Sequence, residues 1–287
     1  MSLRATEFFS GLGGWRYSLG DRGRVVRAFD ISGPANATYA LNHGDHPSVR
    51  ELASVPAPEI TGLKADLWLL SPPCQPFCRM GNRQDLSDPR SKAFLNLLQI
   101  LDGNPPQALA LENVEGFVGS QAHARLTSVL KKHGFHIQEF RLCPTRFGIP
   151  NQRPRVYILA ARHPLPAREA PLMEPERIAR YLDEVEDEAL FLPSSILDRH
   201  GPGLDVVGAD DRRSACFIGG YGRRWVGSGS FLRTSRGIRR FSPAEIARLL
   251  GLPAEFGFPP GLSQEYRYKL LGNSLSLPVA GWVLGGL

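Results

Sequence analysis

Residues 6–19 read TEFFSGLGGWRYSL, and this stretch decides the fold. A short, apolar and β-prone run ends at Phe9, a glycine-rich turn covers Ser10–Gly14, and a helical segment begins at Trp15. A strand, a tight turn and a helix in this order form the start of an α/β unit. The glycines let the backbone approach a ligand closely, and the amides at the helix start can bind an anion or a carboxylate.

The same alternation of strands and helices continues to about residue 162. Further strands are predicted at residues 24–29, 66–70, 108–111 and 155–160, with helices at 91–101 and 124–133. This alternation predicts a doubly wound, mostly parallel sheet in an α/β fold. Ligands of such sheets bind at the carboxyl ends of the strands, and Asp30, Cys74 and Glu112 fall at or just beyond predicted strand ends.

The composition is that of an ordinary globular protein. With 287 residues, 42% hydrophobic and 22% charged, the chain can form one large domain and a small appended one. It has no apolar run of about 18 residues and no secretory signal pattern, so a cytoplasmic protein with no membrane partner is expected. Its four cysteines show no CxxC spacing, so neither a disulfide framework nor a metal site is expected.

A second domain is predicted after Arg162, where the alternation stops and four prolines between residues 164 and 175 indicate a linker. The predicted boundaries are a main domain of residues 1–164 and 239–287 and a small domain of residues 165–238. Residues 242–251 predict a helix that returns to the main domain, with an N-cap serine, a first-turn proline, a capping-box glutamate and a closing glycine.

Charge is segregated along the small domain. Residues 174–188 hold seven acidic residues, whereas residues 212–240 hold eight arginines and no acid. Aromatic residues lie between these arginines, a pattern suited to phosphate contacts and to stacking on unpaired bases. The alternative is a basic surface whose aromatic residues form the core of the small domain, and about half of them are expected to do so.

Residues 71–79 read SPPCQPFCR and contain a cysteine in an unusual setting. Cys74 follows two prolines at the end of a predicted strand, and Pro73 fixes its own φ and restricts the residue before it. The thiol is therefore held on a stiff, exposed turn, whereas most free cysteines are buried core residues. Cys78, Cys143 and Cys216 lack such a frame, and this pattern alone favours a structural role for them.

Other charged residues fall near the same edge of the sheet. Glu112, followed by Asn113 and Val114, brings a carboxyl group to the end of the next strand. Arg153 and Arg155 are two apart at a strand entrance, so we expect both on one face, where they can hold a carbonyl oxygen or a phosphate. Without the cysteine, Glu112 is equally compatible with an exposed acid or a helix N-cap partner, and an arginine pair alone is more often a surface feature.

Together these residues suggest methyl transfer to carbon 5 of cytosine. Carbon 5 is a poor nucleophile, so a thiolate must first add to carbon 6, which creates an enamine-like ring that attacks a sulfonium methyl group. Protonation or strong hydrogen bonding at ring nitrogen 3 supplies the electron sink, which is the role predicted for Glu112, while an arginine holds the base carbonyl. The base must lie outside the stack, either flipped or already unpaired in a loop.

At this point the sequence resembles the DNA cytosine-5 methyltransferase superfamily over nearly its whole length. The segments that match, in the family's order, are residues 7–14, 30, 71–77, 111–114, 152–157, 240–253 and 272–274. The nucleophile loop followed by the Glu-Asn-Val motif is highly specific. The resemblance implies a Rossmann-like domain that depends on S-adenosylmethionine and releases S-adenosylhomocysteine, closed by the C-terminal segment, with a small target-recognition domain.

Several segments are similar to the branch of the superfamily that methylates cytosine 38 in the anticodon loop of tRNA. They are residues 216–217, 220–222, 227–230, 256–259 and 266–272, and Asn151 stands where DNA enzymes commonly carry glutamine. One departure is Ile218, which replaces the threonine of the branch's Cys-Phe-Thr motif and puts any role of that hydroxyl in doubt. The small recognition domain also limits how much DNA sequence could be read directly.

The resemblance implies three sets of site residues. The catalytic set is Cys74, Glu112, Arg153 and Arg155. The cofactor set is Phe9, Ser10, Gly11, Leu12, Gly13, Gly14, Asp30, Ile31, Val55, Ser71, Asn273 and Ser274. The substrate set is Arg79, Cys216, Phe217, Tyr221, Arg223 and Arg224.

The sequence therefore predicts a tRNA cytosine-5 methyltransferase that acts as a monomer on an anticodon stem-loop. A DNA cytosine-5 methyltransferase would use the same chemistry on another polymer. A third hypothesis is a catalytically idle nucleic-acid-binding protein, against which the intact Cys74, Glu112 and Arg155 argue. A nicotinamide dehydrogenase shares only the glycine turn and Asp30 and leaves the proline-framed cysteine unexplained.

Overall fold

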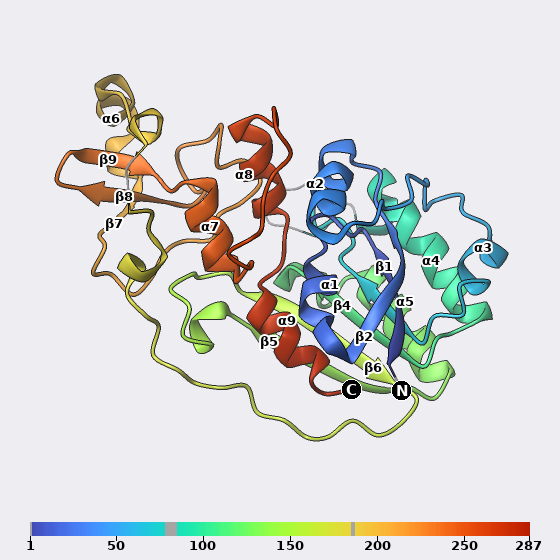
Figure 1. Cartoon of the computed structure of the whole chain (residues 1–287). Helices are drawn as coiled ribbons and strands as arrows, with labels where there is room; N and C mark the ends of the chain where they lie inside the picture. Colours follow the sequence, from blue (N-terminus) through green and yellow to red (C-terminus); the bar gives the residue numbers. More distant parts are fainter. Residues whose placement is uncertain (1, 78–84, 185–186) are drawn as a thin grey trace. The chain divides into compact units, whose positions relative to one another are not determined.

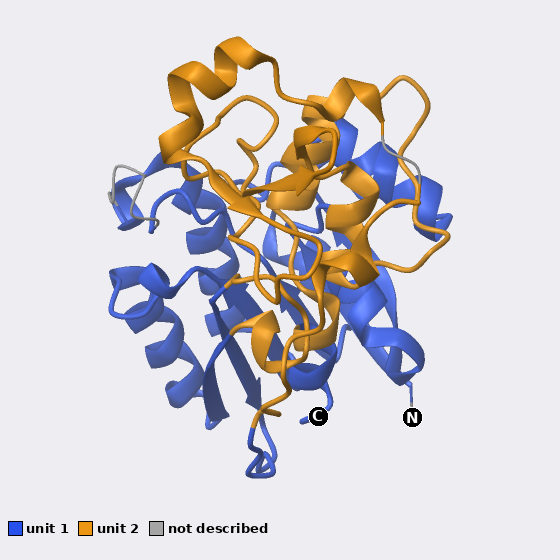
Figure 2. Ribbon diagram, turned by 90° about the vertical axis from the view of Figure 1, so that its left-hand side faces the viewer, with its two compact units in different colours: residues 1–142, 154–169, 280–287 blue, residues 143–153, 170–279 orange. Residues whose placement is uncertain are grey.

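Figure 1 shows the computed structural model, which describes residues 2–77, 85–184 and 187–287. The chain divides into two compact units, which Figure 2 colours separately. Unit 1 consists of Met1–Leu142, Pro154–Glu169 and Ala280–Leu287, and unit 2 of Cys143–Arg153 and Ala170–Val279. Within the described ranges, every helix is too short or too polar to span a membrane.

Unit 1 is built on a six-stranded sheet with the order β2-β1-β3-β4-β6-β5. The strands are β1 (Leu3–Phe8), β2 (Gly23–Phe29), β3 (Leu67–Leu70), β4 (Ala108–Asn113), β5 (His136–Leu142) and β6 (Arg155–Ala161). The first four are mutually parallel, and β6 runs antiparallel to both β4 and β5. The predicted doubly wound, mostly parallel sheet is confirmed, although β5 was not predicted. The carboxyl ends of β1 to β4 and the start of β6 share one edge.

Helices cover both faces of this sheet. Its helices are α1 (Gly14–Leu19), α2 (Gly33–His43), α3 (Ala57–Thr61), α4 (Lys92–Gly103) and α5 (Gln121–Lys132). Phe8 and Trp68 belong to the core cluster that also contains Phe94 of α4 and Leu126 of α5. On the opposite face, Trp15 of α1 packs edge-on against a tyrosine of β6. Because successive side chains of a strand point to opposite faces, each strand contributes side chains to the helix layers on both sides of the sheet.

The last helix, α9 (Leu277–Leu284), begins in unit 2 and ends in unit 1. Within unit 1, its Trp282 contacts Phe140 of β5 with ring centroids 5.2 Å apart. The guanidinium of Arg168 lies over the same indole, 4.3 Å from its centroid. These contacts fix the C-terminal end of the chain on the sheet.

Unit 2 has its own small core. Its elements are α6 (Ser194–His200), β7 (Asp205–Val207), β8 (Ser230–Thr234), β9 (Gly237–Arg240), α7 (Pro243–Leu250) and α8 (Gln264–Gly272). Strand β8 pairs in parallel with β7 and antiparallel with β9. The rings of Phe217, Tyr221 and Phe241 are buried against one another, with centroid distances of 5.0 and 5.1 Å from Phe217. Aromatic side chains thus form the centre of this core, and buried leucines and isoleucines such as Leu232 and Ile246 complete it.

The predicted helix at residues 242–251 is α7, with the predicted caps. Ser242 Oγ accepts a hydrogen bond from the Glu245 amide at 3.1 Å, and the Glu245 carboxylate accepts one from the Ser242 amide at 2.7 Å. The left-handed Gly251 ends the helix. Glu245 also forms a buried two-bond pair with Arg239 of β9, at 2.7 and 2.8 Å. Residues 239–279 therefore pack within unit 2, which differs from the predicted domain boundary at residue 239.

Candidate active site

The glycine turn after β1 has an unusual backbone. Phe9 has a φ of +57°, which is rare for a non-glycine residue, and Gly11 and Gly13 also have left-handed φ values. A Cβ atom on Gly13 would lie 2.2 Å from Nε2 of His43, so only glycine fits there. The buried hydroxyl of Ser10 has no hydrogen-bond partner among the described residues. The turn thus combines a buried hydroxyl without a protein partner and strained backbone, two features that are typical of ligand-binding turns.

Asp30, at the end of β2, is bound directly to this turn. Its carboxylate accepts hydrogen bonds from the backbone amides of Gly11 at 2.9 Å and Ser32 at 2.8 Å. Burial raises the pKa of Asp30, and these hydrogen bonds oppose that rise. The next residue, Ile31, leaves 64% of its surface exposed, so an apolar side chain faces solvent at this edge.

The other residues of the predicted cofactor set lie in different settings. Leu12 is buried behind the turn. Val55 belongs to the hydrophobic core of unit 1, so its side chain is used for packing. Asn273 and Ser274 lie in unit 2, where exposed Asn273 is the C-cap of α8 and Ser274 is buried. Their role in cofactor binding stays a prediction.

A link between the glycine turn and the cysteine turn was not predicted. The indole Nε1–H of Trp15, in α1, donates to Ser71 Oγ at 2.9 Å and lies 3.3 Å from the Leu70 carbonyl oxygen. The ring is almost completely buried. A tryptophan in an apolar stretch reads as a core residue, so nothing in the sequence indicates that its N–H reaches the residue after β3.

Cys74 lies in a tight turn after β3, as the prolines predicted. The Phe77 amide donates to the Cys74 carbonyl at 2.9 Å, which closes the turn, and the cysteine is half-buried. The side-chain amide of Asn113, at the end of β4, donates to the Pro72 carbonyl at 3.1 Å. The turns that follow two neighbouring strands are therefore tied together. Cys78 and Arg79 lie outside the described residues.

Glu112 and Arg155 form an ion pair at the same edge. The distance from Arg155 Nε to Glu112 Oε1 is 3.2 Å, and the two side chains are only 14% and 11% exposed. Arg155 Nη1 also donates to the Pro154 carbonyl at 2.8 Å, which helps to fix the guanidinium. An acid paired with arginine in a mostly buried setting is a candidate proton donor or acceptor whose position is well defined.

Arg153 does not share this setting. Its guanidinium is buried and donates to the carbonyl oxygens of Phe217 at 3.1 Å, Gly272 at 3.0 Å and Ser274. Its Nη1 also lies 3.3 Å from the sulfur of Cys216. The expectation that Arg153 and Arg155 share a face assumed that both belong to a strand, but β6 begins only at Arg155. Arg153 thus joins two loops of unit 2, and its contact with a base stays a prediction.

The predicted substrate residues fall into two groups. Phe217 and Tyr221 are buried, and the Tyr221 hydroxyl donates to the Ser230 carbonyl at 2.7 Å and accepts from the Phe241 amide at 2.9 Å. Their rings are therefore used in the core of unit 2 and are not presented for stacking. Arg223 and Arg224 are exposed, and Arg223 pairs with a glutamate of α8 at 3.0 Å. Most arginines of residues 212–240 are paired with carboxylates, and most of the interleaved aromatic residues pack inward.

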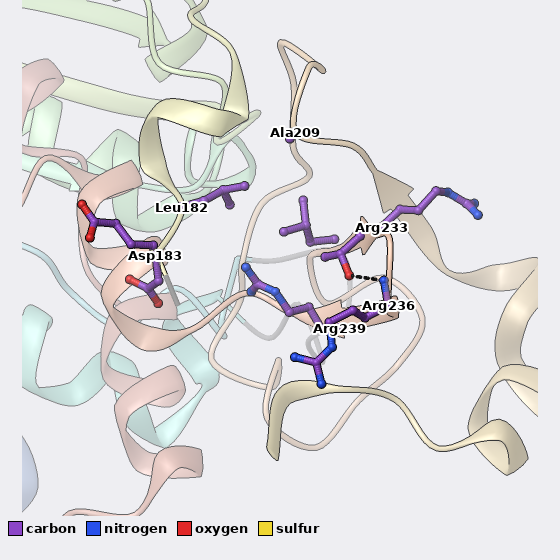
Figure 3. A pocket seen from close by; sticks show the side chains of 9 residues that line it. Leu182, Asp183, Ala209, Arg233, Arg236 and Arg239 are labelled. Carbon is purple, nitrogen blue, oxygen red and sulfur yellow. Dashed lines mark hydrogen bonds between the residues drawn. The ribbon is translucent and has the colours of Figure 1, made fainter. Parts of the chain in front are cut away.

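Unit 2 also contains a pocket of about 560 Å³, shown in Figure 3. It lies between residues 182–184 and the β8–β9 hairpin. Three of its charged groups form ion pairs within the protein: Asp183 with Arg248, Arg239 with Glu245, and Arg236 with a glutamate. The Arg236 amide also donates to the Thr234 hydroxyl at 3.1 Å. Among the residues that line it, none belongs to the predicted catalytic or cofactor set.

A buried carboxyl group, Glu7, lies on β1 beneath the glycine turn. Burial raises its pKa to about 8, against the opposing effect of hydrogen bonds from the Tyr39 hydroxyl and from backbone amides of α1. The Tyr39 hydroxyl donates to Glu7 Oε2 at 3.2 Å. The pKa of Glu7 is higher in the folded protein than in the unfolded chain, so protonation of Glu7 favours the fold. This contribution is complete below the pKa of the unfolded chain and is lost as the pH rises through the folded-state pKa of about 8.

Replacing Glu7 with glutamine should therefore flatten the dependence of stability on pH. Between about pH 5 and pH 8.5, we expect the wild type to lose roughly 4 kcal/mol more unfolding free energy than Glu7→Gln. Urea unfolding followed by circular dichroism at several pH values measures this difference. Parallel stability curves for the two proteins would show that Glu7 does not titrate in this range.

The structure thus brings a glycine turn bound to an acid, and a cysteine turn beside an acid–arginine pair, to one edge of a mostly parallel sheet. These are the features expected of an α/β methyltransferase with a cysteine nucleophile. The chain belongs to the C-5 cytosine-specific DNA methylase family, whose model matches residues 3–190 and 209–285.

Individual relatives match almost end to end. The protein named tRNA (cytosine(38)-C(5))-methyltransferase of Schizosaccharomyces pombe is 34% identical, over 98% of this chain and 96% of the relative. DNA (cytosine-5)-methyltransferase of Dictyostelium discoideum is 31% identical, over 98% of this chain and 93% of the relative. The solved structure of Entamoeba histolytica methyltransferase EhMeth has a TM-score of 0.93 and 29% identity, over 99% and 97% of the two chains. The predicted family, enzyme class and fold are confirmed.

Proposed function

We propose that this cytosine carbon-5 methyltransferase acts on cytosine 38 of a tRNA anticodon loop, with Cys74 as its nucleophile. The observation that carries the proposal is the junction of the Cys74 turn with the end of β4. The Asn113 side chain donates to the Pro72 carbonyl, and Glu112 immediately precedes Asn113 on β4. Arg155, the partner of Glu112, begins β6, and the next residue of β6 is paired with Asn113. A thiol and a fixed carboxyl group are thereby delivered to one edge of the sheet.

The residues of the glycine turn fit S-adenosylmethionine as the cofactor. The unpartnered hydroxyl of buried Ser10 can donate a hydrogen bond to the carboxylate of a methionine moiety. Asp30 has its carboxylate fixed by two amides, each bound to a different oxygen, so both oxygens keep a lone pair for ribose hydroxyls. Exposed Ile31 offers an apolar surface for the adenine ring. When bound, the cofactor supplies an electrophilic methyl group on sulfur.

The protein's part in the reaction begins with the Cys74 thiolate. It adds to carbon 6 of the cytosine, a C–S bond forms, and the electron pair of the 5,6 double bond becomes available at carbon 5. Glu112 delivers a proton or a strong hydrogen bond to ring nitrogen 3 and so neutralises the negative charge that develops there. Arg155, paired with Glu112 at 3.2 Å, holds the carboxyl group and has further donors for the base carbonyl.

Turnover then requires the enzyme to be released from the base. After a methyl group has been bonded to carbon 5, loss of the carbon-5 proton to solvent or a base restores the double bond, and the C–S bond to Cys74 breaks. The thiolate is regenerated and Glu112 recovers its proton from ring nitrogen 3. Cys74 is thus a true catalyst that ends each cycle unchanged.

RNA is favoured over DNA as the substrate by two observations. The relative of S. pombe, 34% identical over nearly the whole chain, carries a name that specifies cytosine 38 of tRNA. In unit 2, exposed Arg223 and Arg224 lie on a small scaffold with a three-stranded sheet, which suits recognition of a folded RNA by shape more than direct reading of a DNA sequence. A cytoplasmic location and a monomeric state stay predictions from the sequence.

Labelled S-adenosylmethionine offered with either tRNA or duplex DNA tests the substrate. Bulk tRNA should be labelled, and an anticodon stem-loop transcript with uridine in place of cytosine 38 should not be. We expect DNA to accept label at a rate at least about 100-fold lower, because a duplex must also be opened to expose the base. Labelling of DNA in preference to tRNA, as the name of the D. discoideum relative would suggest, would overturn the assignment.

A further inference from the structure

At Gly116, the turn that follows β4 lies so close to the backbone of the cysteine turn that no side chain fits between them. A Cβ atom built on Gly116 would lie 2.3 Å from the carbonyl oxygen of Phe77, a distance that real Cβ atoms essentially never show. The φ of Gly116 lies outside the left-handed region, so alanine could adopt its backbone conformation. Glycine is therefore required at residue 116 for a steric reason, because any Cβ atom would clash with the carbonyl oxygen of Phe77.

Phe77 transmits this contact to the cysteine. Its amide donates to the Cys74 carbonyl at 2.9 Å, so Phe77 and Cys74 are the two ends of one hydrogen-bonded turn. The Phe77 side chain is buried and meets the ring of Phe117 edge-on, with centroids 5.1 Å apart. Phe117 is itself fully buried against Phe94 of α4. Among the residues that the structure describes, the Phe117 ring thus supports the Phe77 ring from one side.

Asn113 holds the cysteine turn on the other side of Cys74, at Pro72. Its side chain donates to the Pro72 carbonyl at 3.1 Å and accepts from the Val114 amide at 2.8 Å. The cysteine turn is thus held at both ends, by Asn113 before Cys74 and by Gly116 after it. Both anchors belong to the segment that begins at Glu112.

We propose that Gly116 is a positioning residue, whose missing side chain lets the turn after β4 set the place of the Cys74 thiol relative to the Glu112 carboxyl group. The inference rests on the proposed nucleophilic role of Cys74. A methyl group at residue 116 must displace the Phe77 carbonyl by several tenths of an ångström or more, and misplacements of about 1 Å at a reacting group cost on the order of 100-fold in rate.

Gly116→Ala tests this directly. We expect kcat on tRNA to fall by roughly 10- to 100-fold, while KM for tRNA and the affinity for S-adenosylmethionine change by less than about twofold. The rate of covalent trapping on tRNA that contains 5-fluorocytosine should fall in the same proportion. The matched control is Gly103→Ala at the end of α4, where a Cβ meets no atom within 4 Å and φ is not left-handed; it should keep wild-type kcat.

A second variant keeps the inference testable if Gly116→Ala does not fold. Phe117→Leu leaves Gly116 in place but removes the edge-on contact that blocks the Phe77 ring, so it should lower kcat by roughly threefold or more with unchanged cofactor affinity. Wild-type kcat in folded Gly116→Ala, or a loss confined to cofactor binding, would overturn the positioning role. Failure of the wild type itself to form any adduct would instead refute the proposed function.

Discussion

Replacing Cys74 with alanine is expected to abolish methyl transfer, with a loss of roughly 1,000-fold or more in kcat, and to leave the fold intact. The loss is large because carbon 5 of cytosine cannot attack the methyl donor until a thiolate has added to carbon 6. The fold survives because the turn is held by the Asn113 side chain and by the Phe77 amide, neither of which uses the thiol. Transfer of labelled methyl groups to tRNA and thermal unfolding provide the two measurements.

Cys143→Ala is the matched control for this experiment. Cys143 is also a half-buried cysteine, but its sulfur lies 3.6 Å from the Asn151 carbonyl in unit 2 and is absent from the proposed mechanism. It should retain activity within about threefold of the wild type. Appreciable transfer by Cys74→Ala, or equal losses in the two variants, would remove Cys74 from its proposed role.

Glu112→Gln should lower kcat by about 100-fold or more, which is the range that a positioned acid contributes to proton transfer. Glutamine has nearly the same size and can still accept a hydrogen bond from Arg155, whose Nε lies 3.2 Å from Glu112 Oε1. The substitution therefore keeps the geometry of this contact but removes the proton that the carboxyl group can transfer. KM for tRNA and affinity for S-adenosylmethionine should change little. Single-turnover rates measure the chemical step without product release.

Glu115 provides the control for this carboxyl group. It lies three residues further along in an exposed turn, so Glu115→Gln makes the same chemical change outside the site. We expect its rate to match that of the wild type. Activity of Glu112→Gln within about threefold of the wild type would show that ring nitrogen 3 receives its proton elsewhere.

The catalytic edge of the sheet could be predicted because its signals are local. A glycine turn after a strand, an acid at the next strand end and a cysteine framed by prolines each report their own backbone conformation. Asp30, Cys74 and Glu112 accordingly fall where parallel strands end, as the alternation of strands and helices predicted. The tie between the two turns, through Gly116 and Phe77, depends on residues nearly 40 positions apart and leaves no periodic pattern.

Unit 2 was harder to predict because aromatic residues can serve there either for base stacking or for the hydrophobic core. Aromatic residues between arginines indicate base stacking, but Phe217 and Tyr221 are buried, since a small sheet needs large side chains to exclude water. Arg239, in the same basic stretch, is buried against Glu245, which comes from the next helix. Sequence shows charge and aromatic content, but the choice between core and surface depends on which segments pack together.

Mass spectrometry of the covalent complex tests the central claim most directly. Wild-type enzyme is incubated with S-adenosylmethionine and tRNA that carries 5-fluorocytosine at position 38, where fluorine on carbon 5 prevents release of the enzyme. Digestion should yield one cross-linked peptide, with the modified nucleotide bonded to the sulfur of Cys74. An adduct on another residue such as Cys216, or methylated tRNA formed with no adduct at all, would contradict the account.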